Sequence, residues 1–146
     1  MIRLCVLSTC VVALSVAAPD FPIYNITIVN EATDGDADAE LCLCGRGTGE
    51  CGSLGYVKRN GARALFGPLQ WHEKTYPDGH VCYDWIRLRA GSANPPSPYF
   101  PDHACALDNA AMGRVWEAAL ANTTPTLTLR GNASAYACDL EALGAT

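Results

Sequence analysis

The cysteines constrain the fold of this chain more than any other feature of its sequence. Eight are present, and two of them, Cys5 and Cys10, lie within the first ten residues. An even number of further cysteines in a chain of this length is typical of a disulfide framework, provided that the protein folds in an oxidising compartment. The six further cysteines are Cys42, Cys44, Cys51, Cys82, Cys105 and Cys138.

The N-terminus predicts such a compartment. One positive charge precedes an apolar run over residues 4–14, and small side chains follow at Ser15 and Ala17. This three-part pattern is typical of a secretory signal peptide, and the run falls short of the roughly 20 apolar residues of a membrane-spanning helix. We therefore expect residues 1–17 to be a cleaved signal peptide. Residues 18–146, which contain no comparable apolar run, are expected to form a single secreted, disulfide-rich domain without a transmembrane segment.

Six cysteines allow fifteen patterns of three disulfides, and their spacing narrows the choice only slightly. On a strand, Cys42 and Cys44 would point to the same face about 6 to 7 Å apart, so we expect each to bond a distant partner. At least one of them is expected to reach Cys82 or Cys138. The competing interpretation is a zinc site at Cys42, Cys44 and Cys51, but the second cysteine pair of such motifs is missing. We expect disulfides, with no metal and no cofactor.

Three sequons for N-linked glycosylation follow the predicted signal peptide, at Asn25, Asn122 and Asn132. In a secreted chain these asparagines are expected to face solvent and to carry glycans. Alternation around Asn25 then places Ile26 and Ile28 on the opposite, core-facing side of a strand.

The acidic residues argue against a nucleic-acid partner and suggest one possible calcium site. The formal net charge is −5, which argues against a nucleic-acid partner held by phosphate contacts. Asp34, Asp36 and Asp38 resemble the start of a calcium-binding loop, although the glycine and glutamate that an EF-hand requires further on are missing. We expect residues 30–40 to form a hydrated acidic loop.

Strand patterns dominate the rest of the chain. A turn at residues 76–79 leads into residues 80–89, which we expect to form one strand, whereas Gly67-Pro68 is expected to end the preceding strand. Residues 124–130 and 134–138 predict a closing hairpin.

One helix is predicted near residues 108–121. Asp108 is the expected N-cap, and apolar residues spaced three and four apart predict a core-facing stripe of Met112, Val115, Trp116, Ala119 and Leu120. The predicted fold class is α+β and mostly β, a small disulfide-stapled antiparallel sheet or sandwich with this one helix packed on it.

Aromatic residues and arginines suggest a binding function. Interfaces are enriched in tryptophan, tyrosine and arginine, so the candidate partner-contact residues are Trp85, Arg87, Arg89, Tyr99 and Phe100. Together with the predicted signal peptide and the sequons, these residues favour a secreted, glycosylated, non-enzymatic binding protein or effector. Such a protein would act on an extracellular or cell-surface protein.

Two alternatives remain open. His72 and His80, with Glu73 and Asp84 nearby, could supply the acid and the base of a small secreted hydrolase of ribonuclease type. No nucleophile or oxyanion site accompanies them in the sequence, so no catalytic residue is assigned beyond this alternative. The third alternative is a structural component of a wall or matrix.

Overall fold

The structure is a computed structural model, and it describes residues 23–44, 51–70, 72–91, 102–132 and 134–142. The predicted signal peptide and the candidate contact residues Tyr99 and Phe100 lie outside these ranges.

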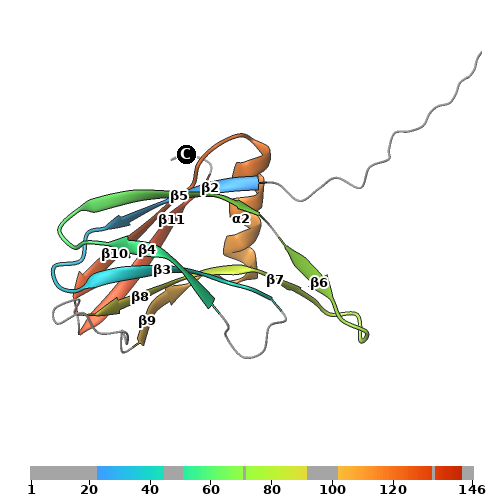
Figure 1. The fold of residues 1–146 in the computed structure, drawn as a ribbon, viewed down its shortest axis with the longest axis horizontal. Helices are drawn as coiled ribbons and strands as arrows, with labels where there is room; N and C mark the ends of the chain where they lie inside the picture. Colours follow the sequence, from blue (N-terminus) through green and yellow to red (C-terminus); the bar gives the residue numbers. More distant parts are fainter. Residues whose placement is uncertain (1–22, 45–50, 71, 92–101, 133, 143–146) are drawn as a thin grey trace, which may run out of the picture.

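The first sheet has four strands in the order β11-β10-β2-β5 (Figure 1). Its strands are β2 (Ile23–Asn30), β5 (Ala62–Gln70), β10 (Thr126–Asn132) and β11 (Ala135–Glu141). β2 runs antiparallel to β5 and parallel to β10, and β10 forms the predicted closing hairpin with β11. Ile26 and Ile28 are fully buried while Asn25 is exposed, which confirms the assignment of the two faces of β2.

The second sheet also has four strands, in the order β4-β3-β8-β9, and all of its pairs are antiparallel. Its strands are β3 (Asp36–Cys42), β4 (Cys51–Val57), β8 (Trp85–Gly91) and β9 (Asp102–Ala106). Ala37 and Ala39 of β3 and Ile86 and Leu88 of β8 are buried and face the interior that the two sheets share.

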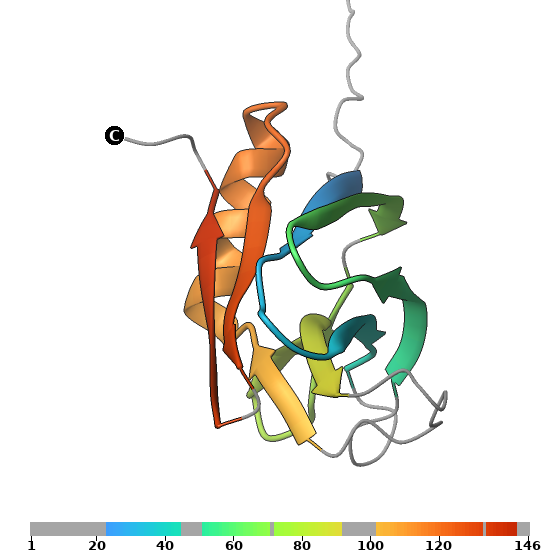
Figure 2. The ribbon, with the colours of Figure 1, turned by 90° about the vertical axis from the view of Figure 1, so that its left-hand side faces the viewer.

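The helix α2 (Asn109–Leu120) lies where the sequence predicted it. The side chain of Asp108 caps it by accepting a hydrogen bond from the backbone N–H of Ala111, at 2.8 Å. Met112 and Val115 are buried in the same core as the residues of both sheets. In Figure 2 the strands surround this interior and α2 lies on the side of β10 and β11. Leu120 was wrongly placed in the core stripe, because in the last turn it is 68% exposed.

A two-stranded hairpin, β6 (Glu73–Thr75) and β7 (Val81–Tyr83), projects from the body of the molecule (Figure 1). The predicted turn closes it: the N–H of Tyr76 donates to the carbonyl of His80, and that of Gly79 donates to the carbonyl of Tyr76. The prediction of one strand over residues 80–89 was wrong. Asp84 interrupts it, because its side chain turns into the protein and separates β7 from β8.

Two further predictions were wrong for physical reasons. Residues 36–40 were expected in a hydrated loop, yet they form most of β3, since their alanines face the core and their acids pair with arginines of β8. Gly67-Pro68 was expected to end a strand, but β5 continues through it. β5 lies at the edge of its sheet, where a proline costs no ladder hydrogen bond if its missing N–H faces outward.

Three disulfides join the six cysteines: Cys42–Cys51, Cys44–Cys82 and Cys105–Cys138. Cys44 reaches Cys82 as expected, whereas Cys42 bonds a neighbour in the sequence because β3 and β4 place it directly opposite Cys51. The predicted α+β, mostly β, disulfide-stapled fold is confirmed. No helix within the described ranges combines the length and the apolar character that crossing a lipid bilayer demands.

Candidate binding groove

A groove of about 670 Å³ lies between the β6–β7 hairpin and the start of α2. Four segments contribute to it: the hairpin, the first residue of β8, the end of β9 and the turn that precedes the helix. We call it the aromatic groove. Its lining residues are Tyr76, His80, Val81, Cys82, Tyr83, Trp85, Ala106, Leu107, Asp108 and Asn109.

Aromatic rings form the hairpin side of the groove. Tyr76 and His80 stack across the turn with ring centroids 4.4 Å apart, and the ammonium of Lys74 lies 4.9 Å from the centroid of the Tyr76 ring. Tyr83 and Trp85 are partly buried and pack against the hydrophobic core. Tyr83 on β7 and Trp85 on β8 are therefore anchored by the core, whereas Tyr76 and His80 belong to the turn of the hairpin.

The helix side of the groove is polar. Asp108 is exposed, and its capping hydrogen bond to Ala111 fixes the position of its carboxylate. On the hairpin, His80 Nδ1 lies 2.5 Å from a carboxylate oxygen of Asp78. The groove thus combines apolar ring surface with a few oriented polar groups, as small ligand and peptide sites do.

The histidines proposed for the hydrolase alternative line different cavities. His72 Nδ1 lies 2.7 Å from a carboxylate oxygen of the buried Asp84, beside a cavity of about 220 Å³. The other oxygen of Asp84 accepts a hydrogen bond from the backbone N–H of Cys44, at 2.8 Å. His80 faces the aromatic groove instead and pairs with Asp78, so each histidine has a carboxylate of its own.

The two arginines among the candidate contact residues form ion pairs with acids of the same sheet and are only partly exposed. Arg89 lies 2.7 Å from Asp38 and 2.8 Å from Glu40, and Arg87 lies 2.7 Å from Glu40. The hydrogen bond to Asp38 raises the pKa of Arg89, and the charge of Glu40 adds to the effect. Asp38 also accepts a hydrogen bond from Ser53, at 2.5 Å.

These ion pairs include two buried acids whose burial the sequence analysis missed. Asp38 and Glu40 are 1% and 5% exposed, although residues 30–40 were expected to be hydrated. The signal was present in the alternation of acids with alanines on β3, matched by the alternation of arginines with apolar residues on β8. Of the candidate contact residues within the described ranges, only Trp85 lines the aromatic groove.

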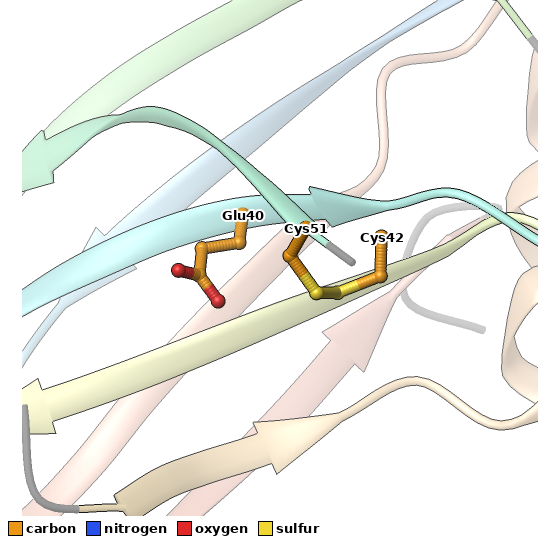
Figure 3. Close-up of side chains that lie close together, drawn as sticks. All are labelled: Glu40, Cys42 and Cys51. Carbon is orange, nitrogen blue, oxygen red and sulfur yellow. A yellow bond between two sulfur atoms is a disulfide. The ribbon is translucent and has the colours of Figure 1, made fainter. Parts of the chain in front are cut away.

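The cluster considered as a zinc site has a different chemistry. Figure 3 shows Cys42 and Cys51 joined by their disulfide, with the carboxylate of Glu40 beside it. A disulfide offers no thiolate to a metal, and Glu40 already faces two guanidinium groups.

The acids considered as a calcium loop also point to separate partners. Asp34 accepts a hydrogen bond from the hydroxyl of Tyr136, at 3.0 Å, and Asp36 accepts one from the backbone of Arg59, at 3.2 Å. Asp38 belongs to the arginine network described above.

The three sequons lie on the first sheet and the segment that follows the helix. Asn25 lies on β2, Asn122 follows α2 and Asn132 ends β10, and all three residues are exposed. The sequence contains no sequon in the β6–β7 hairpin or in the strands of the second sheet. Glycans at these positions would leave the lining of the aromatic groove unmodified.

Comparisons with family models, with curated proteins and with solved structures found no match for this chain.

Proposed function

We propose that this chain is a secreted, glycosylated binding protein that engages an extracellular or cell-surface protein through the aromatic groove. The predicted signal peptide, the three disulfides and the three sequons support an extracellular role. An effector of this kind needs a recognition surface that its own glycans do not cover.

The groove is the single observation that carries the proposal. Tyr76, Tyr83 and Trp85 present ring surface beside a projecting hairpin, and tyrosine and tryptophan are the residues that most often dominate interface energetics. Such rings contribute a large contact area at a low cost in side-chain entropy. The groove also lies on the part of the chain that carries no sequon.

The test compares binding of two variants to an array of extracellular and cell-surface proteins. Tyr76→Ala removes a ring of the hairpin that lies outside the hydrophobic core, so the fold should be retained. Leu65→Ala is the control, since Leu65 is an exposed apolar residue of β5, away from the groove. We expect Tyr76→Ala to weaken binding at least about tenfold, whereas Leu65→Ala leaves it unchanged. Equal binding by the two variants would contradict the proposal.

A small secreted hydrolase is the second candidate, and one observation favours it. His72 is about half exposed and is held at 2.7 Å by the buried Asp84, an arrangement that orients an imidazole as a general base. His72→Ala should then abolish turnover of RNA oligonucleotides or of ester substrates, with His80→Ala as the comparison. Under the binding proposal neither variant changes a rate, and His72→Ala, which lies outside the aromatic groove, keeps partner binding.

A further inference from the structure

We infer that the aromatic groove takes an arginine or lysine side chain from an extended basic segment of the protein partner, an inference that rests on the function proposed above. The described residues that line the groove include one carboxylate, Asp108, and no lysine or arginine.

The chemistry of the walls favours a cation. The faces of tyrosine and tryptophan rings attract an ammonium or guanidinium group electrostatically, and a carboxylate beside the ring adds a charge-assisted hydrogen bond. The ring of Tyr76 already holds the ammonium of Lys74 at 4.9 Å, which shows that the hairpin rings accept a cation in this fold. Trp85, Tyr83 and Asp108 offer the same combination inside the groove.

The charges around the groove also favour a basic partner. Asp78 lies at the tip of the hairpin and adds a second carboxylate close to the groove, paired with His80. Lys74 is a cation close to one of these rings, that of Tyr76. The formal net charge of −5 adds long-range attraction for a basic partner and repulsion for an acidic one.

An oligosaccharide is the competing occupant, because aromatic rings also stack on sugars. Sugar stacking needs no charge on the ligand, so the affinity would depend little on salt. A basic segment makes the opposite prediction, since partly exposed ion pairs are screened by salt.

The experiment titrates the whole secreted protein with three capped nine-residue glycine-serine peptides that carry three arginines, three glutamates or no charge. Nuclear magnetic resonance follows the backbone signals of Val81, Tyr83 and Trp85. We expect only the arginine peptide to shift these signals, and we expect its affinity to fall at least about threefold between 0.1 and 0.5 M salt.

Asp108→Asn removes the negative charge but keeps the fold, because asparagine caps a helix about as well as aspartate does. The control is Glu117→Gln, which removes the same charge from an exposed position of the same helix. Asp108→Asn should weaken binding of the arginine peptide about threefold and Glu117→Gln should not. Equal effects of the two variants, equal binding of the three peptides, or shifts with chito- or cello-oligosaccharides instead would overturn the inference.

The array described for the proposed function distinguishes the two failures. If Tyr76→Ala abolishes binding to a partner and Asp108→Asn does not, the groove is the binding site and the partner is not recognised by its positive charge. If neither variant changes binding, both proposals are wrong.

Discussion

The disulfide Cys105–Cys138 should contribute more to stability than its position at the surface of the fold suggests. Cys105 lies on β9, the edge of the second sheet, and Cys138 lies on β11, the edge of the first. The other two disulfides join β3 to β4, within one sheet, and the end of β3 to the hairpin. Among the described cysteines, Cys105–Cys138 is therefore the disulfide that joins the two four-stranded sheets, and its replacement by two alanines tests how much the fold depends on it.

The length of the closed loop sets the expected magnitude. The cysteines are 33 residues apart, and the chain-entropy relation for a loop of that length gives about 3.7 kcal/mol at 25 °C. For Cys42–Cys51, 9 residues apart, the same relation gives about 2.6 kcal/mol. Because the whole stability of a domain is about 5 to 15 kcal/mol, loss of the longer loop removes a large fraction of it.

Urea unfolding under oxidising conditions measures the loss of stability. It also tests whether that loss arises from the unfolded chain. We expect Cys105→Ala/Cys138→Ala to lower the free energy of unfolding by about 3 to 4 kcal/mol. We also expect a larger dependence on urea concentration, because the unfolded chain without the cross-link exposes more surface. The double alanine variant of Cys42 and Cys51 is the comparison for a short loop. A loss below about 1 kcal/mol, or a loss with an unchanged urea dependence, would refute the reasoning.

Four further outcomes are expected. Asp108→Ala should lower the free energy of unfolding in urea by about 1 kcal/mol, and Asp108→Asn by almost nothing, because only alanine abolishes the helix cap. Leu129→Ala should cost about 2 to 5 kcal/mol in the same assay, since Leu129 is fully buried between the sheets. Arg89→Ala should cost about 3 to 5 kcal/mol, because it leaves the buried Asp38 and Glu40 short of positive charge; a double variant that also carries Asp38→Asn should recover part of the loss. Burial, with the hydrogen bond to Asp34, raises the pKa of Tyr136 from 10.0 to about 12, so its contribution is complete below pH 10 and is lost as the pH rises through about 12. Relative to Tyr136→Phe, the wild type should therefore lose thermal stability over that range, and parallel pH profiles of the two proteins would contradict this.

The correct sequence predictions rested on patterns of neighbouring residues. Alternation around Asn25 identified the buried face of β2, and the spacing of Met112 and Val115 after Asp108 located the helix almost to the residue. In both cases one face or stripe meets the core, so the burial pattern repeats along the chain with the period of the element itself.

The wrong predictions depended on contacts between distant residues. Acid-rich composition predicted a loop over residues 30–40, yet Asp38 and Glu40 are buried because β8 brings Arg87 and Arg89 across from them, about 50 positions later in the chain. No local rule reveals that partner. The same pairing explains why the arginines proposed as partner contacts form ion pairs within their own sheet instead.

The aromatic groove could not be predicted for a similar reason. Trp85 was singled out for its residue type, but the residues that complete the groove come from the hairpin, the end of β9 and the start of α2. Their proximity depends on Asp84, whose burial ends the strand that the sequence suggested and redirects the hairpin away from the second sheet.

The base of the hairpin is held in a way that suits a recognition element. Asp84 binds the side chain of His72 and the backbone N–H of Cys44, and Cys44 is itself bonded to Cys82 on β7. A covalent bond and a buried carboxylate therefore fix the same short segment to the end of β3. A two-stranded hairpin alone is at best marginally stable in water, so these two attachments account for a projecting arm that keeps its shape. An arm that is ordered before binding loses less entropy when a partner docks. The attachments at the base of the hairpin and the aromatic rings of the groove should therefore both increase the affinity of the complex.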